Sequence, residues 1–272
     1  MNRRAIFAIA RKDLKVVWQN KGVSIPIIII LPLILFVVLP LMLGLVPTLS
    51  VPSDSFAEVQ QMMDTMPPAL RASLVGLTLM QQTVVLFLVY IMAPLYLIVP
   101  MMVSSVVAAD SFAGEKERKT LEALLYTPTS DRELLVAKML GAWLPAVAVA
   151  WLGFALYAVV VNLAGWPTMG RVFFPNAMWL VLAIWVAPAG AGLGLASMGL
   201  VSVRAQGFQD AYQLGTLAIL PIVILIIAQA TGVIYFSVTL VLLLGLVLWI
   251  IDAVLIVFGN RTFRRSELIA RM

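Results

Sequence analysis

The sequence concentrates its ionisable side chains between residues 110 and 139. Within this stretch, the run Gly114-Glu-Lys-Glu-Arg118 carries two carboxylates and two cationic groups on four consecutive residues. Groups of both signs can form charge-assisted hydrogen bonds with a partner protein. The spacing of Glu115 and Lys119, four residues apart, predicts a short helix, which Pro128 ends. A solvated loop fits the same charge run, so both interpretations stay open at this point.

A second candidate group is Asp252, the one ionisable residue well inside an apolar segment. A carboxylate in the centre of a membrane helix costs about 2.5–3.5 kcal/mol, so such residues often mark ion paths. A position near the end of the helix, protonation, or pairing with a neighbouring helix accounts for the same residue without an ion path. Asp252 is therefore a candidate intramembrane polar site.

The sequence contains no cysteine and no histidine. The missing cysteines exclude disulfides, thiolate metal sites and thiol catalysis, and the missing histidines remove the usual general base and zinc ligands. We therefore expect a chain that is not an enzyme and that binds no metal or cofactor of its own.

The composition indicates an integral membrane protein. Of the 272 residues, 62% are hydrophobic and only 11% are charged, too few to cover a soluble globule of this size. The mean hydropathy is +1.05. A membrane helix needs about 20 apolar residues, and the charge-free windows accommodate six such helices. The expected spans are residues 23–46, 83–108, 135–162, 177–202, 212–229 and 233–258. The sequence predicts an all-α integral membrane protein with six transmembrane helices.

Lysine and arginine residues predict which way the chain faces. Sixteen of the 18 lie before span one, between or just inside spans two and three, after span four or after span six, whereas only Arg71 and Arg171 lie on the opposite side. The positive-inside rule then places both termini in the cytoplasm. The net charge of +5 reflects this bias, so no nucleic-acid partner is needed. We expect a plasma-membrane protein, in a prokaryote the inner or cytoplasmic membrane.

The chain divides into three expected parts. Residues 1–22 form an N-terminal amphipathic interfacial helix, residues 23–258 the six-span domain, and residues 259–272 a basic cytoplasmic tail. The six-span domain includes an outer loop at 48–82 and a cytoplasmic segment at 110–134. In the first part, apolar residues fall on one helical arc beside basic ones, which suits a helix lying on anionic headgroups or an ordinary juxtamembrane helix. The apolar residues of the arc are Phe7, Ala10, Leu14, Val17 and Trp18.

Several patterns predict how the spans pack. Prolines inside spans one and two, such as Pro94, free backbone carbonyls that a neighbouring group must bind in lipid. Glycines and alanines in span four predict close helix packing. The stretch 229–232 predicts the turn between spans five and six, and Ser130 with Glu133 predicts a capping box at the start of span three.

The segment at 110–139 resembles the signature of the type-2 ABC transporter permeases. The matching residues are Gly114 to Arg118, Thr120 to Glu122, Leu124-Leu125, Thr127-Pro128 and Lys138. Softer matches are Val203-Arg204 through Leu220-Pro221 and the Ala-Arg-Lys-Asp run at 10–13. The resemblance covers nearly the whole chain and is specific at 110–139.

The resemblance implies a non-catalytic permease subunit of an ABC exporter. Its expected partners are an ABC ATPase in two copies, which holds ATP and magnesium, a second permease protomer that is identical or different, and the lipid bilayer. A cytoplasmic coupling helix between spans two and three is expected to contact the ATPase. The expected contact residues are Gly114, Glu115, Lys116, Glu117, Arg118, Lys119, Thr120, Leu121, Glu122, Leu124, Leu125 and Pro128. The N-terminal helix is expected to add a second surface.

Two other functions fit the same sequence. An ion-coupled secondary transporter would use Asp252 and would need no ATPase. A membrane assembly subunit that transports nothing would share the six spans. Transport that depends on ATP separates the first interpretation from both of these.

Overall fold

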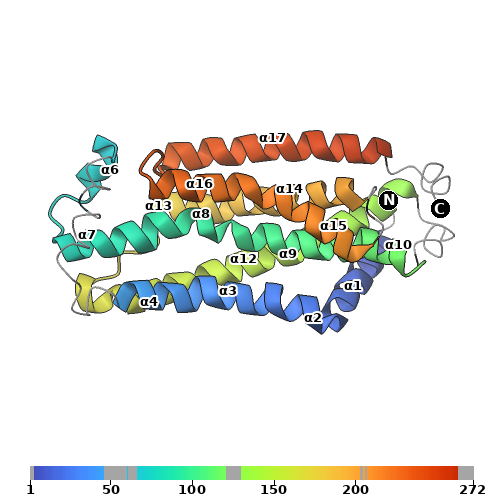
Figure 1. Ribbon diagram of the computed structural model, residues 1–272, viewed down its shortest axis with the longest axis horizontal. Coiled ribbons are helices and arrows are strands. Elements are labelled where there is room, and N and C mark those ends of the chain that lie inside the picture. Colours follow the sequence, from blue (N-terminus) through green and yellow to red (C-terminus); the bar gives the residue numbers. More distant parts are fainter. Residues whose placement is uncertain are drawn as a thin grey trace.

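The structure is a computed structural model that describes residues 3–45, 60, 66–120, 130–202, 205 and 207–262. These residues form helices and the turns between them, with no β-strand among them. Six helical stretches are long and apolar enough to cross a membrane, as the sequence predicts, and they lie side by side as an elongated bundle (Figure 1). Spans one to six are Ile25–Leu45, Leu79–Glu117, Glu133–Met169, Ala177–Ser202, Phe208–Ala230 and Val238–Val257.

Four of the spans are built from consecutive short helices. Span one joins α3 (Leu31–Leu33) and α4 (Leu39–Leu45) through π-helical turns at Ile25–Ile30 and Ile34–Val38, and α2 (Lys21–Ser24) leads into it. Span two joins α7 (Leu79–Val85), α8 (Met92–Tyr96), α9 (Ile98–Ala109) and α10 (Glu115–Glu117) through π-helical turns at Leu86–Ile91 and Asp110–Gly114. Span four joins α13 (Ala177–Val181) to α14 (Ala187–Ser202), and span five joins α15 (Phe208–Gly215) to α16 (Leu220–Ala230). Prolines interrupt the regular hydrogen-bond ladder in these spans because they carry no N–H.

The end of span two and the start of span three differ from the expected boundaries. Span two continues to Glu117 instead of ending near residue 108, so residues 110–117 extend a membrane helix and do not start a separate one. Helix α12 (Asp131–Met169) also exceeds its expected range at both ends. The predicted capping box at its start is confirmed, since Ser130 and Glu133 exchange hydrogen bonds of 3.1 and 3.3 Å. Span two can extend beyond its apolar window because Asp110 and Glu115 find cationic partners within the chain.

The connection between spans five and six turns where the sequence predicts. Thr231 ends α16, and Gly232 has a positive φ of 75°, a conformation that glycine adopts without steric cost. Helix α17 (Val238–Thr262) begins five residues later than expected. Its start is set by Ser237, whose hydroxyl accepts a hydrogen bond of 3.2 Å from the backbone N–H of Leu240.

Spans two and four form the centre of the bundle, and spans one, five and six expose most of their apolar surface. Gly194 in α14 lies directly against α9, where a methyl group on it would overlap the Ser104 hydroxyl and come 2.5 Å from the Met101 carbonyl oxygen. The predicted role of the small residues in span four, close packing of helices, is thereby confirmed.

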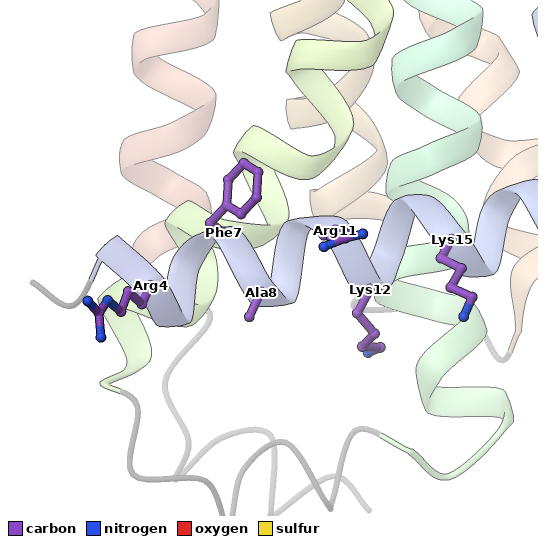
Figure 2. A pocket seen from close by; sticks show the side chains of 6 residues that line it. All are labelled: Arg4, Phe7, Ala8, Arg11, Lys12 and Lys15. Atoms are coloured by element: carbon purple, nitrogen blue, oxygen red, sulfur yellow. The ribbon is translucent and has the colours of Figure 1, made fainter.

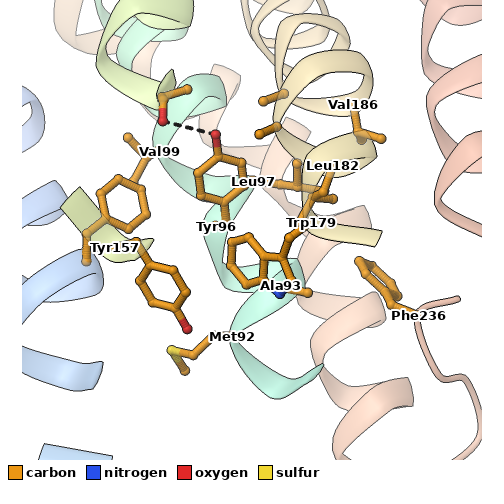
Figure 3. Close-up of a cluster of buried hydrophobic side chains, with 14 of the residues drawn as sticks. Met92, Ala93, Tyr96, Leu97, Val99, Tyr157, Trp179, Leu182, Val186 and Phe236 are labelled. Atoms are coloured by element: carbon orange, nitrogen blue, oxygen red, sulfur yellow. Dashed lines mark hydrogen bonds between the residues drawn. The ribbon is translucent and has the colours of Figure 1, made fainter. Parts of the chain in front are cut away.

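An aromatic cluster fills the bundle around span two (Figure 3), where Tyr96 donates a hydrogen bond of 3.0 Å to the Ala150 carbonyl. Pro94 has no N–H to offer the carbonyls of Val89 and Tyr90, which lie five and four residues earlier. The Trp179 indole of span four donates to the Val89 carbonyl at 2.7 Å, and the Gln229 amide of span five donates to that of Tyr90. The donors that replace the missing N–H of Pro94 are therefore side chains of spans four and five.

The remaining helices lie at the two ends of the bundle (Figure 1). Helix α1 (Arg3–Gln19), which lies within the expected range 1–22, crosses the bundle where span two ends and span three begins. Helix α6 (Pro68–Ser73) lies at the other end, beside the start of span two. The rest of the expected outer loop, residues 46–59 and 61–65, is outside the described residues, as is the tail from residue 263.

Candidate functional site

The charged run at the end of span two lies inside a network that joins four parts of the chain. Glu115 is only 3% exposed, although it belongs to a segment expected to face a partner. Its carboxylate accepts a hydrogen bond of 2.6 Å from Lys138 of α12 and a second from Lys12 of α1. Glu115 therefore ties together span two, span three and the N-terminal helix.

A second carboxylate, Asp13 of α1, completes this network. Asp13 is 2% exposed and accepts a hydrogen bond of 2.6 Å from the hydroxyl of Ser111 in span two. Lys138, which is 1% exposed, lies 4.0 Å from the Asp13 carboxylate and donates to both the carbonyl and the hydroxyl of Ser111. Lys12 approaches Asp13 to 3.3 Å. We call Lys12, Asp13, Ser111, Glu115 and Lys138 the inner network.

Helix α1 reaches this position through a close contact with α12. The Cα atom of Ala10 would lie 3.3 Å from a methyl group on Gly141, so a glycine here lets the two helices approach. Ile6, Ala10, Asp13 and Val17 are buried and fall on one helical face, at a spacing of three or four residues. Asp13 thus occupies an otherwise apolar face, and the Ser111 hydroxyl and the Lys12 ammonium compensate its burial.

Arg118 extends the network beyond the last residue of span two. Its guanidinium binds both carboxylate oxygens of Asp110, at 2.9 and 3.2 Å. Gly114 makes room for this contact, since a methyl group on it would lie 2.9 Å from the Asp110 carboxylate and 3.2 Å from the guanidinium. The hydrogen bond and charge of Asp110 raise the pKa of Arg118 above its ordinary value.

The charges of these groups balance. Three carboxylates (Asp13, Asp110, Glu115) face three cations (Lys12, Arg118, Lys138). Partial burial lowers the pKa of Lys12, but the hydrogen bond to Glu115 and the charges of Glu115 and Asp13 outweigh it and raise that pKa. Lys12 therefore stays protonated at neutral pH. Removing one member would leave an uncompensated buried charge, which is far more costly than losing a surface pair.

The two remaining charged residues of the run reach the start of span five. Lys116 donates a hydrogen bond of 3.1 Å to the Ala205 carbonyl. Glu117 accepts one of 2.9 Å from the backbone N–H of Phe208, the first residue of α15. A carboxylate at this place satisfies one free N–H and interacts favourably with the helix dipole. Each of the four charged residues at 115–118 thus has at least one partner within the chain.

The expected coupling helix is only partly within the described residues. Gly114 to Glu117 belong to span two, Arg118 ends the helix, and Lys119 has a positive φ of 55°. Thr120 folds back through two hydrogen bonds to the Glu115 carbonyl. Leu121, Glu122, Leu124, Leu125 and Pro128 lie outside the described residues. The structure therefore brings the first half of the predicted contact together at the end of span two.

Sequence reasoning named Lys138 and the run at 10–13 as matches to a family pattern but gave neither a role in an ion network. Asp13 could have been found from its helical face, because it repeats with Ile6, Ala10 and Val17. Ser111 carries no such signal. Its role depends on where α1 packs, which local sequence does not encode.

Asp252 lies apart from this network, between spans four and six. It is 2% exposed, and its carboxylate rests on Gly192, where an added methyl group would overlap it. Neither carboxylate oxygen accepts a hydrogen bond from any described residue. No group of three His, Cys, Asp or Glu residues that could hold a metal ion occurs in the described parts of the chain.

Comparison with known proteins gives one match. The family model described as "ABC-2 family transporter protein" matches residues 7–259. No curated protein matches the chain.

Proposed function

The chain belongs to the ABC-2 transporter family, and from this premise we propose that it is the permease subunit of an ATP-binding cassette exporter. The 272 residues contain no Gly-x-x-x-x-Gly-Lys-Ser/Thr loop, so ATP and magnesium are assigned to a separate ATPase subunit. Two permease protomers form the path, and each docks one ATPase from the cytoplasm. The lysine and arginine distribution supports cytoplasmic termini.

One observation carries the coupling part of this proposal: Glu115 binds Lys138 of α12 and Lys12 of α1, while Lys116 and Glu117 bind the chain at the start of span five. The segment between Arg118 and Ser130 connects the end of span two to the start of α12. A force that an ATPase applies to this segment acts on span two. The inner network then transfers the displacement to α1 and span three, and Glu117 transfers it to span five.

This arrangement divides the expected contact residues into two groups. Glu115 is buried and serves as an internal connection. Lys119 and the following residues to Pro128 are the docking part, supported by the exposure of Lys119 and by the family pattern. Glu117 is exposed beside the start of α15 and belongs to both groups.

The first experiment isolates the chain with a tag from native membranes and asks what co-purifies. The proposal expects a protein that carries a phosphate-binding loop, and it expects ATP-dependent movement of cargo when both are reconstituted in vesicles. Transport without any ATPase, or a chain that never associates with one, would overturn it.

A point variant tests the docking part. Lys119→Asn removes the charge while keeping a residue type that tolerates positive φ. A lost charge-assisted contact is worth about 1.5–3 kcal/mol, so ATPase affinity should fall about 10- to 100-fold. Lys21→Asn, an equally exposed lysine outside the segment, serves as the control and should bind normally. Equal binding by both variants would exclude Lys119 from the contact.

One observation favours a second candidate function, an ion-coupled transporter. The Asp252 carboxylate is buried and accepts no hydrogen bond from the described residues, as expected for an ion path. Asp252→Asn would then abolish transport, and transport would require no ATPase. Normal transport by this variant, or a strict dependence on ATP, decides for the exporter.

A further inference from the structure

Helix α1 has three distinct sectors around its circumference. At about 100° per residue, the buried face of Ile6, Ala10, Asp13 and Val17 occupies one side. Arg4, Ala8, Arg11 and Lys15 repeat at the same spacing on the opposite side and are all exposed. Phe7 and Trp18 lie on the flank between them and are 71% and 53% exposed. The helix is therefore not simply amphipathic: one apolar face contacts the bundle, and a second apolar flank is left uncovered.

The basic sector lines an open pocket with a volume of about 720 Å³ (Figure 2). Ala8 forms its floor, since its small side chain leaves space between the longer basic ones. Arg4, Lys12 and Lys15 point away from the spans, whereas Phe7 points to the side on which the spans lie. Arg11 and Lys15 form no ion pair with any residue that the structure describes. The pocket thus joins an uncompensated positive charge to an apolar wall.

The place of α1 in the bundle restricts what can fill this pocket. The helix crosses the span ends, and only Asn20 separates it from α2, which leads into span one. An exposed phenylalanine and tryptophan at this level match the depth at which aromatic rings settle in a bilayer. A basic sector beside such a flank lies at the level of the lipid phosphates. A water-soluble acidic protein would satisfy the charges but would leave the apolar flank uncovered.

We propose that the basic sector of α1 is a binding site for the headgroup of an anionic phospholipid. Arg11 and Lys15 bind the phosphate, Arg4 lies at the outer edge, and an acyl chain passes along Phe7. Lys12 lines the pocket and also binds Glu115, so the bound lipid lies next to the inner network. The anionic lipid thereby stabilises α1 in its docked position. The inference uses the proposed function only to place α1 at the cytoplasmic face of the membrane.

The test measures lipid binding to the permease alone, without an ATPase. The purified chain in a neutral detergent is titrated with dioctanoyl-phosphatidylglycerol, and with dioctanoyl-phosphatidylcholine for comparison, while native mass spectrometry counts the bound lipids. The wild type should prefer the anionic lipid at least tenfold. Each basic residue near a phosphate contributes about fivefold in affinity, so Arg11→Gln with Lys15→Gln should weaken phosphatidylglycerol binding about 25-fold and leave phosphatidylcholine unchanged.

The control is Lys21→Gln, a single exposed lysine just beyond the helix and outside the pocket. It should bind within twofold of the wild type, whereas Lys15→Gln alone should lose about fivefold. If Lys21→Gln loses as much as Lys15→Gln, only general surface charge attracts the lipid, and the site does not exist. Equal binding of both lipids by the wild type would overturn the proposal as well.

A second measurement separates the lipid from a protein partner. If the double variant binds phosphatidylglycerol normally but no longer associates with an ATPase, the basic sector is an ATPase contact and the lipid assignment is wrong. If the lipid is lost and the ATPase still binds in phosphatidylcholine vesicles, the assignment holds. The titration contains only the permease. Its result therefore remains valid even if the chain is not a subunit of an exporter.

Discussion

Replacing Lys138 with methionine tests whether the inner network holds together helix α1, the end of span two and the start of span three. Methionine has nearly the same length and no charge. The Lys138 ammonium is 1% exposed and contacts Glu115 at 2.6 Å, the Ser111 hydroxyl at 3.1 Å and the Ser111 carbonyl. Lys138→Met therefore removes three hydrogen bonds and leaves Asp13 and Glu115 with one cation, Lys12, in place of two.

The magnitude follows from the charge that is left behind. Two carboxylates and two ammonium groups sum to zero in the wild type, and the variant carries one uncompensated negative charge in a buried site. Breaking a buried pair costs about 3–5 kcal/mol. We take the lower value of about 3 kcal/mol, because Lys12 still binds Glu115 and is half-exposed. Adding Glu115→Gln restores neutrality, so the double variant should recover at least about half of the loss.

The assay is reversible unfolding of the purified chain in mixed micelles, followed by helix content and tryptophan fluorescence. Lys21→Met, at an exposed position, should change the free energy of unfolding by no more than about 0.5 kcal/mol. The reasoning is refuted if Lys138→Met is as stable as the wild type. It is also refuted if the double variant is no more stable than Lys138→Met alone, since the carboxylate of Glu115 would then not be the group left uncompensated.

Three further predictions use the same chain. Gly192→Ala should destabilise the protein by about 1–3 kcal/mol in the unfolding assay because the methyl group overlaps the Asp252 carboxylate, and Asp252→Ala in that background should relieve the loss. Tyr157→Phe removes only the hydroxyl that binds a carbonyl of span two, so it should cost about 1–3 kcal/mol, and an unchanged unfolding midpoint would contradict this. The chain lacks cysteine, so one introduced thiol reports orientation. A membrane-impermeant maleimide should label Arg171→Cys on intact cells but Lys21→Cys only after permeabilisation, and the reverse pattern would show that the chain is inserted the other way round.

The sequence predicts the spans well because burial in lipid depends on the composition of one continuous segment. Ala177–Ser202 matches its expected range at both ends, and the turn at 229–232 lies where glycine and threonine interrupt the apolar run. The boundaries are less accurate where charged residues extend a helix. Glu115 reads as a residue that ends the membrane segment, yet span two continues through it because Lys12 and Lys138 compensate its charge.

The prolines also show which features the local sequence predicts and which depend on tertiary packing. The lack of an N–H at Pro94 follows from the residue type alone, and so does the need for a replacement donor. Which groups supply it does not follow, since Trp179 and Gln229 come from two other spans, 90 and 139 residues away from the carbonyls they bind. The residue type of Pro94 therefore predicts that these carbonyls need new donors, and tertiary packing determines which side chains supply them.

The amino-acid sequence by itself determined that this is a membrane chain of six apolar helices with a charged segment between the second and third. The chain also matches the model of its family over residues 7–259. Only the tertiary structure decided which of those charges are buried. Lys12 and Glu115 are 103 residues apart, and no periodicity links them. They meet because α1 packs against Gly141 of α12, and the low polarity of that contact makes their pairing necessary.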